Sequence, residues 1–460
     1  MGLKQEQRKP LLGLAAVLAV TALVYLPGLG VYFLADDFQY LGLVTRLRGV
    51  GDLIPYMLGL RRYLGWGGGG ILFFWLGHAL GGMDVLPYRL MSLSVHALNT
   101  CLVFILAYRL GGGRRGLAGV IAALVFALHP RQHEAVMWLA AAPWPLGISA
   151  GLLCILTYVS WRASGRLRWL GAAALACALA VLLNPALAVL PVILAVYDLL
   201  RGERQRSALT IWTGMMLVAG VAALAASGGS VPLGEEGLPY GFLLSRASHW
   251  PVFLAYIWWP VVVDLKAVMN QFPGYFVVVI AMSVVGAALA GFAVWRSTIL
   301  ARWGGCWALL ALVIPSFASS FIADRYMGLA LVGVGLAVAG LVSELSQPAL
   351  QRAVLLVLLG ALLAVLQVTM KLNDWQMAGR ITTTVRDETL QRYPVAPTGA
   401  RLLYKGLPDT VNRCVVWSYG LPSAVRLWYN DPTIQVVRVE DGIPVPSEQR
   451  DVILDFTGRW

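Results

Sequence analysis

Two adjacent carboxylates follow the first long apolar run of the chain, in the stretch LADDFQY from Leu34 to Tyr40. A carboxylate at the edge of a hydrocarbon layer is costly to desolvate unless it has a partner or a role. Asp36 or Asp37 could take a proton from a hydroxyl group, acting as a general base. The alternative interpretation is that the pair only marks the boundary between the apolar run and water.

A second group of polar residues surrounds a His-Pro pair. His129, His133 and Glu134 bring two imidazoles and a carboxylate into a six-residue stretch. Such a set can bind a divalent cation such as Mg²⁺ or Mn²⁺, or it can contact a phosphate directly. A histidine that precedes a proline can also simply cap a helix.

Basic side chains suited to phosphate occur at two further places. Arg325, which follows Asp324, carries a planar guanidinium that fits a phosphate or pyrophosphate. It could instead form an ion pair with Asp324 or Asp37 and brace two neighbouring helices. Arg246 and His249 lie one helical turn apart and could serve the same phosphate from one helix face. They could equally anchor a surface helix to lipid headgroups.

The composition is that of a protein with many membrane spans. Of the 460 residues, 59% are hydrophobic and only 13% are charged, and the mean hydropathy is +0.72. These values exclude an ordinary soluble globule. The net charge of +12 is not packed into one basic tract, so nucleic acid is not an expected partner. The five cysteines have no paired spacing that would indicate a disulfide framework or a metal cage.

Residues 11–34 are expected to form the first membrane span. Lys4, Arg8 and Lys9 before it predict a cytoplasmic N-terminus. The apolar run is too long for the core of a signal peptide, so we expect the span to be retained. Residues 35–85 then form the first outer loop, with short helices at the membrane surface.

The remaining apolar runs predict about eleven spans in total, with the basic clusters between them on the cytoplasmic side. The stretch 243–262 would, as a span, put Arg296 and Arg302 outside, so we interpret it as a surface-lying or re-entrant helix. Two spans form a hairpin that is broken at Asn184-Pro185. The other expected spans include 86–110, 116–129, 208–226, 275–296, 304–321, 327–345 and 352–370.

From residue 371 onward the apolar character is lost. A polar helix over 371–392 is followed by the β-like runs ARLLY, CVVW and IQVVRV, separated by Pro, Gly and Asp. About 90 residues suffice for one small domain. We therefore predict a membrane domain over 1–370 and a small extracytoplasmic α/β domain over 371–460. This second domain either braces the outer face or binds a substrate.

The predicted topology gathers the unusual polar residues on one side of the membrane. The carboxylate pair, the His-Pro group, Arg246 with His249, and Arg325 all fall at outer ends of spans or in outer loops. All five histidines of the chain lie at or near the outer half. Such a concentration indicates a reaction centre at the boundary between membrane and water.

Several stretches resemble a known family. LADDFQY, LPYRLMSLSVHALNTCLVFILAYRL and AALVFALHPRQHEAVMWLAAAPWPLGISAGLLCILTY resemble the GT-C superfamily of membrane glycosyltransferases. More narrowly, they are similar to bacterial relatives of the transmembrane and tetratricopeptide-repeat O-mannosyltransferases. The most specific pattern is a His-Pro, a Glu four residues after that Pro, and a Trp four residues after the Glu. The resemblance covers about residues 11–345.

This resemblance implies transfer of a sugar from a polyprenyl-phosphate carrier to a hydroxyl of an acceptor protein or glycan. The reaction would occur with inversion, on the extracytoplasmic face of the cell membrane. By motif match, Asp36 or Asp37 would be the base, and Glu134 with His129 or His133 would flank a metal or the donor phosphate. Arg325 would meet the carrier phosphate.

Two other functions remain open at this stage. A non-catalytic accessory subunit would present its outer domain, residues 371–460, to a partner. A flippase for a lipid-linked sugar would need polar groups through the middle of the bilayer and paired, broken helices. The predicted spans three to ten carry almost no ionisable residues at mid-depth, which disfavours the flippase.

Overall fold

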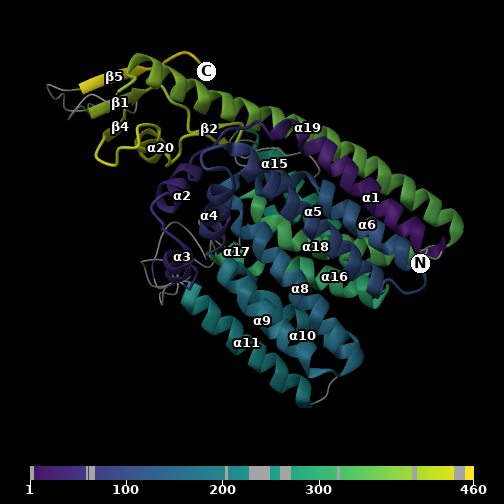
Figure 1. Cartoon of the computed structure of the whole chain (residues 1–460). Helices are drawn as coiled ribbons and strands as arrows, with labels where there is room; N and C mark the ends of the chain where they lie inside the picture. Colours follow the sequence, from purple (N-terminus) through teal and green to yellow (C-terminus); the bar gives the residue numbers. More distant parts are fainter. Residues whose placement is uncertain are drawn as a thin grey trace.

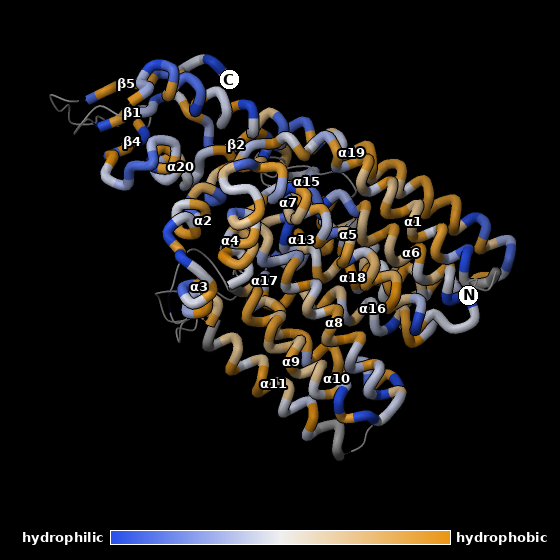
Figure 2. The backbone as a smooth tube through the Cα atoms, in the orientation of Figure 1, coloured by the Kyte–Doolittle hydropathy of each residue, from blue (hydrophilic) through white to orange (hydrophobic). Residues whose placement is uncertain are grey.

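The computed structural model describes residues 5–58, 61, 68–202, 206–226, 249–258, 271–318, 322–395, 401–439 and 451–460. These residues form a bundle of helices with a small group of strands at one end, close to the C-terminus (Figure 1). Hydrophobic residues follow the helices of the bundle, and hydrophilic ones gather near the strands and at the turns (Figure 2). The predicted mainly helical fold with a small C-terminal α/β part is confirmed.

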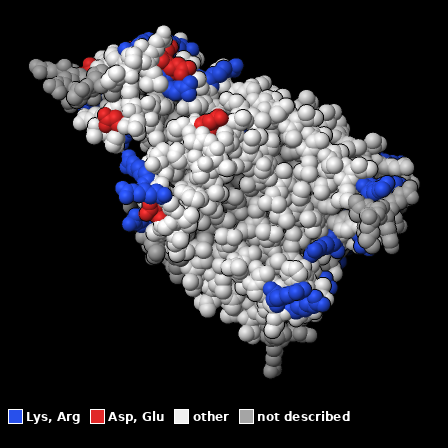
Figure 3. All heavy atoms as spheres, in the orientation of Figure 1, with Lys and Arg blue, Asp and Glu red and all other residues white. Residues whose placement is uncertain are grey.

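Within this described part, seven helical stretches are long and apolar enough to cross a membrane. A broad surface free of charged side chains separates the charged groups at the two ends of the face shown in Figure 3. The chain is therefore a multi-pass membrane protein. The total of eleven spans stays a prediction, because several further apolar helices are shorter. The seven stretches are Arg8–Gly28, Val85–Leu110, Leu139–Ser164, Val277–Trp295, Ile299–Phe317, Asp324–Ser343 and Gln347–Arg392.

The first helix is shorter than the sequence predicts. Helix α1 covers Gln5–Tyr25 and is followed by a 3₁₀ turn over Leu26–Gly28, so the predicted span to residue 34 is wrong at its end. Pro27 lacks the backbone N–H that an α-helix would need there. The chain then runs irregularly to Ala35, so the carboxylate pair stands at the start of the next helix, with Asp36 as its N-cap residue and Asp37 as its first residue.

Three short helices occupy the predicted first loop, which confirms the expected helices, while the side of the membrane on which they lie stays a prediction. Helices α2 and α3 lie at one end of the bundle, and α4 packs against α2, α5 and α8, with Phe74 of α4 stacked on Tyr40 of α2 at 5.0 Å between ring centroids. Burial of one face therefore holds α4 in place, rather than the membrane surface alone. The bounds are Asp37–Val44 for α2, Val50–Met57 for α3 and Gly69–Gly81 for α4.

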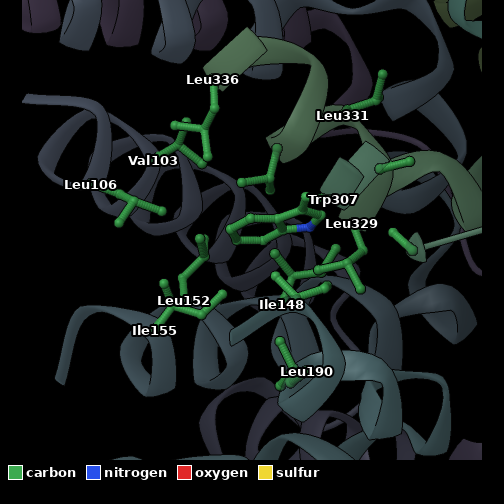
Figure 4. Packing of buried hydrophobic residues seen from close by; sticks show 14 of the residues in the cluster. Val103, Leu106, Ile148, Leu152, Ile155, Leu190, Trp307, Leu329, Leu331 and Leu336 are labelled. Carbon is green, nitrogen blue, oxygen red and sulfur yellow. The ribbon is translucent and has the colours of Figure 1, made fainter. Parts of the chain in front are cut away.

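The body of the bundle is packed by large apolar side chains and by small residues where helices approach closely. Trp307 is fully buried among leucine and isoleucine side chains from several helices (Figure 4). A Cβ on Gly304 would lie 2.6 Å from the Gly333 carbonyl oxygen, so these helices meet backbone to backbone. The helices are α5 (Val85–Leu110), α6 (Arg115–Leu128), α8 (Pro143–Ser164), α9 (Leu167–Leu183), α10 (Leu190–Leu200), α11 (Arg206–Ala226), α13 (His249–Trp258), α15 (Pro273–Trp295), α16 (Ile299–Leu310), α17 (Val313–Ala318) and α18 (Gly328–Ser343).

The predicted hairpin break at Asn184-Pro185 is confirmed. Helix α9 ends at Leu183, and the Asn184 side chain accepts a hydrogen bond of 3.0 Å from the backbone N–H of Ala186. This bond caps the 3₁₀ turn Pro185–Val189 that leads into α10. The asparagine is therefore a structural cap in the bundle.

One helix joins the bundle to the C-terminal strands. Helix α19, Gln347–Arg392, runs along α1 (Figure 1) and passes the predicted boundary at residue 371 without a break. Its first half exposes leucines such as Leu355 and Leu359, whereas Trp375 and Val385 in its second half are buried. The change of composition at residue 371 therefore marks where α19 passes from an exposed apolar surface to packing against other parts of the protein.

The strands form two small sheets. Strands β4, β1 and β5 pair in that order and are all parallel, with Leu403 opposite both Val437 and Ile453. Helix α20, Leu421–Trp428, lies between β1 and β4 in the chain, as a parallel crossover requires. Strands β2 and β3 form an antiparallel hairpin. The strands are β1 (Arg401–Lys405), β2 (Thr410–Val411), β3 (Cys414–Val415), β4 (Gln435–Val439) and β5 (Asp451–Asp455).

Candidate active site

A pocket of about 390 Å³ lies where the loop after α1 meets the C-terminal strands. Its described wall comes from residues 35–36, 133–138 and 322–325, together with residue 371 of α19 and residues 410–419. The structure thus brings four predicted site residues together from distant parts of the chain. They are Asp36, His133, Glu134 and Arg325.

The other predicted site residues do not line this pocket. Asp37 is buried, His129 is half-buried, and His249 begins helix α13. Arg246 lies outside the described residues, so its predicted pairing with His249 stays a prediction.

Asp37 is held by the fold. It is the first residue of α2 and has no exposed surface. Its Oδ2 accepts a hydrogen bond of 2.9 Å from the backbone N–H of Leu34, and its Oδ1 accepts one of 2.7 Å from that of Ala140. Burial raises the pKa of Asp37 to about 7, although the Arg89 charge and the two backbone donors lower it. Both carboxylate oxygens thus fasten the loop to the neighbouring turn.

Asp36 faces the pocket and is only half-buried. Its Oδ1 is buried, and no residue in the described part of the chain donates a hydrogen bond to it. Burial raises the pKa of Asp36, while the positive charge of Arg325 lowers it. A buried carboxylate oxygen that can still accept a hydrogen bond, and that lies beside a cavity, is suited to take a proton from a bound hydroxyl.

Two polar turns that are far apart in the sequence are locked by ion pairs. The Arg131 guanidinium donates to Asp324 Oδ1 at 2.9 Å, and the Arg325 guanidinium pairs with Glu134. The Arg325 backbone N–H also donates to Glu134 Oε2 at 3.0 Å. The partner of Arg325 is therefore Glu134, and the alternative pairing with Asp324 or Asp37 is wrong. Sequence reasoning missed Arg131, although its opposite charge to Asp324 in a second outer turn was a usable signal.

His133 is fixed between two partners. The indole N–H of Trp375 in α19 donates to His133 Nδ1 at 3.0 Å. Because an indole can only donate, Nδ1 accepts, and Nε2 carries the proton that is shared with Asp324 Oδ2 at 3.0 Å. A buried chain Trp375–His133–Asp324–Arg131 therefore supports the pocket from behind.

The predicted cation set does not fit a metal in this arrangement. His129 Nδ1 accepts the backbone N–H of Arg131 at 3.3 Å and caps a 3₁₀ turn, and His133 and Glu134 are engaged as described. Among the described residues, no group of three His, Cys, Asp or Glu side chains could hold a metal ion. The requirement for Mg²⁺ or Mn²⁺ stays a prediction.

The C-terminal strands hold the loop that carries Asp36. Ala35 has φ +43°, in the left-handed region, and its N–H donates to the Val416 carbonyl at 2.9 Å. Gly420 lies so close to Ala35 that a Cβ on it would collide with the Ala35 carbonyl group. Phe38, two residues after Asp36, stacks on Trp417 at 5.8 Å between ring centroids. The direction of Asp36 therefore depends on a domain that lies almost four hundred residues later in the chain.

The same domain brings basic side chains to the pocket. Lys371 Nζ lies 3.0 Å from Asp374 Oδ2 and donates to the Asn412 carbonyl at 3.0 Å. Arg413, at the tip of the β2–β3 hairpin, donates to the Tyr256 hydroxyl at 3.2 Å. Sequence reasoning named neither cation, because nothing in the sequence places this hairpin over the outer loops.

Comparison with known proteins gives one sequence relative. No protein-family model matches the chain. Protein O-mannosyl-transferase Tmtc1 of Drosophila melanogaster is 30% identical to this chain over 163 residues. That stretch is 34% of this chain and 18% of the relative, so the chain matches less than a fifth of the relative's length.

Solved structures give broad but low similarity. ArnT from Cupriavidus metallidurans in the apo state is 16% identical over 93% of this chain and 86% of that chain, with a TM-score of 0.43. ArnT bound to undecaprenyl phosphate is also 16% identical, over 94% and 86% of the two chains, with a TM-score of 0.42. Arabinofuranosyltransferase AftD from Mycobacteria is 17% identical over 96% of this chain and 32% of that chain, with a TM-score of 0.47.

The sequence match confirms the resemblance that the motifs predict. A relative named as an O-mannosyltransferase is the type of protein expected from the acidic pair and the His-Pro pattern. The chain is thus a multi-pass α-helical membrane protein with a small C-terminal α/β part, and about a third of it is similar in sequence to a protein O-mannosyl-transferase.

Proposed function

We propose that this protein transfers a sugar from a polyprenyl-phosphate carrier to an acceptor hydroxyl, with Asp36 as the general base. The observation that carries the proposal is the buried Asp36 Oδ1, which faces a pocket and receives no hydrogen bond from any described residue. Asp37 is unsuited to this role because both of its oxygens accept backbone hydrogen bonds. The name of the relative Tmtc1 makes mannose the first sugar to test.

The reaction that fits is a single displacement. Asp36 takes the proton of the acceptor hydroxyl while its oxygen forms a bond to the anomeric carbon. The bond from that carbon to the phosphate oxygen breaks, and its electron pair stays on the phosphate, so the configuration inverts. The raised pKa of Asp36 makes it a stronger base than an exposed carboxylate. Arg325, whose charge acts on Asp36, would stabilise the departing phosphate.

The distribution of basic residues supports the proposed orientation. Arg114 and Arg115 lie between α5 and α6, and Arg166 and Arg168 lie near the α8–α9 turn. On the face shown in Figure 3, basic side chains lie at both ends, and acidic ones accompany them only toward the C-terminal strands. Basic loops stay in the cytoplasm, which supports a pocket on the extracytoplasmic side of the cell membrane, with the N-terminus inside.

The test is transfer of radiolabelled sugar by the purified protein in detergent, beginning with polyprenyl-phosphate mannose. Wild type is compared with Asp36→Asn and with the neighbouring Asp37→Asn as the matched control. We expect Asp36→Asn to lower transfer by about 10²–10⁴-fold, the usual contribution of a general base. Asp37→Asn is expected to retain transfer in the fraction that folds.

Two results would count against the proposal. Unchanged transfer by folded Asp36→Asn would rule out Asp36 as the base. Absence of transfer with any donor, in a wild-type protein that still binds the carrier lipid, would favour the accessory subunit. That alternative further predicts that both aspartates are replaceable while the surface of residues 371–460 is not.

A further inference from the structure

The hairpin between β2 and β3 has an unusual residue at its tip. Its two turn residues, Asn412 and Arg413, have φ +45° and +73°. Two-residue hairpins of this kind favour Asn followed by Gly, because both positions require positive φ. An arginine in the second position carries a backbone strain that glycine would avoid. Strain of this kind at a pocket is a reason to look for a function of the side chain.

The Arg413 side chain is positioned at the pocket by its neighbours. It lines the same cavity as Asp36, and its guanidinium donates to the hydroxyl of the buried Tyr256 at 3.2 Å. Its charge also acts on Asp324. Lys371 holds the hairpin from α19 by donating to the Asn412 carbonyl at 3.0 Å. The arginine is thus presented by a tethered turn, and α13 supports it.

The chemistry of the pocket indicates what such a cation would bind. The departing phosphate needs positive charge, and the Arg325 guanidinium that would meet it is already paired with Glu134. Asp36 comes from the loop after α1, whereas Arg413 and Lys371 come from the C-terminal part of the chain. A guanidinium binds phosphate oxygens through two parallel N–H donors, which a single ammonium cannot do.

We propose that Arg413 binds the phosphate of the lipid carrier, so that the C-terminal domain forms part of the substrate site. This inference rests on the proposed donor class, and it adds a substrate contact to a domain that would otherwise only brace the loop. In this proposal, the backbone strain at Arg413 is offset by the contact of its side chain with the phosphate.

Binding of undecaprenyl phosphate to the full-length protein in detergent tests this without requiring turnover. The variants are Arg413→Gln, which removes the charge, and Arg413→Gly, which also relieves the turn. The control is Arg459→Gln, because Arg459 lies in the same domain, pairs with Glu388 and does not line the pocket. We expect both Arg413 variants to bind the phospholipid about tenfold more weakly, as for loss of one charge-assisted hydrogen bond. Binding of uncharged undecaprenol and the behaviour of the control should not change.

The thermal unfolding midpoint of Arg413→Gly separates a ligand-binding role from a structural one. Because glycine suits φ +73°, we expect this variant to unfold at or above the wild-type temperature while its affinity falls. A marked drop in its unfolding temperature would overturn the proposal in favour of a structural contact with Tyr256. Unchanged affinity in both Arg413 variants would also overturn it.

The source of the phosphate is resolved by competing lipids. Phosphatidylglycerol vesicles and inorganic phosphate are titrated in parallel with undecaprenyl phosphate. Equal loss of binding to phosphatidylglycerol and to undecaprenyl phosphate would mean that Arg413 contacts any anionic headgroup, which overturns the assignment to the carrier. Binding that depends on Arg413, in a protein that transfers no sugar, would support the phosphate site while the proposed transfer fails.

Discussion

Asp36 and Asp198 are both carboxylates near a helix end, yet their surroundings differ. In the last turn of α10, Asp198 Oδ2 accepts hydrogen bonds from the Tyr158 hydroxyl at 2.5 Å and the Trp212 indole at 3.1 Å. Its Oδ1 lies 3.1 Å from Arg162 Nε. Asp36, in contrast, has a buried oxygen to which no described residue donates, and it borders a cavity. An ion pair and two hydrogen bonds to neighbouring helices therefore make Asp198 a carboxylate that holds helices together, whereas Asp36 borders a cavity open to a substrate.

The comparison extends to what positions each group. The partners of Asp198 come from α8 and α11, which pack beside α10 within the bundle. Asp36 depends on Val416 and Gly420, which belong to the C-terminal domain. A site that is completed by a second domain can be altered without unfolding the bundle, and this difference gives four further tests.

The largest effect on stability is expected for Asp198 and its partners within the bundle. Asp198→Ala leaves Arg162, whose side chain is 11% exposed, without its carboxylate. Breaking such a buried pair costs about 3–5 kcal/mol of unfolding free energy. Chemical unfolding in detergent measures the loss, and sugar transfer per folded molecule should be unchanged. Lost transfer in a protein of wild-type stability would instead make Asp198 functional.

The next effect is a pH dependence of stability at Asp37. Its pKa is raised to about 7 in the folded protein, above the value of about 3.9 for an unfolded aspartate. The stabilisation from the protonated form is therefore fully present below about pH 4 and is lost as the pH rises to about 7. Because one pKa unit is about 1.4 kcal/mol, wild type should lose up to ~4 kcal/mol relative to Asp37→Asn over this range. Unfolding midpoints at several pH values check this, and a constant difference would contradict it.

A smaller effect, on the rate, is expected where the second domain meets the loop. A methyl group in Gly420→Ala would push against Ala35 and displace Asp36. A misplacement of about 1 Å can cost about 10²-fold in kcat, while the KM for the donor should change little. Gly458→Ala is the control, because Gly458 has open space around it and its φ of +76° makes an alanine there destabilising without any contact with Ala35. Equal loss of kcat in both variants would point to general destabilisation.

The smallest effect compares two tryptophans whose indole N–H groups donate to two different clusters, one at the pocket and one within the bundle. Trp375→Phe removes the donor to His133 Nδ1, and Trp212→Phe removes a donor to Asp198. Each should lower the unfolding free energy by about 1–3 kcal/mol. Only Trp375→Phe should also slow transfer, because His133 lines the pocket. Equal transfer rates in the two variants would show that the hydrogen-bonded series Trp375–His133–Asp324–Arg131 is purely structural.

The sequence by itself determined the class of the fold and most of the helices. Apolar runs such as 86–110 must form helices in a membrane, because no water satisfies their backbone there. The break at Asn184-Pro185 and the strands ARLLY and IQVVRV were also predictable from turn and strand chemistry. The sequence likewise named Asp36, His133, Glu134 and Arg325 as polar residues of one outer side.

Only the tertiary structure decided which of those residues line the pocket and which hold the fold together. Asp36 and Asp37 are neighbours of one chemical type, and the contacts of Asp37 with Leu34 and Ala140 turn one inward and leave the other at the pocket. The pairing of Arg325 with Glu134 joins turns 191 residues apart. The Arg413 hairpin and Gly420 reach the site because α19 carries their domain back over the outer loops. Local propensity fixes where helices begin and end, but contacts between distant segments depend on how the whole bundle packs.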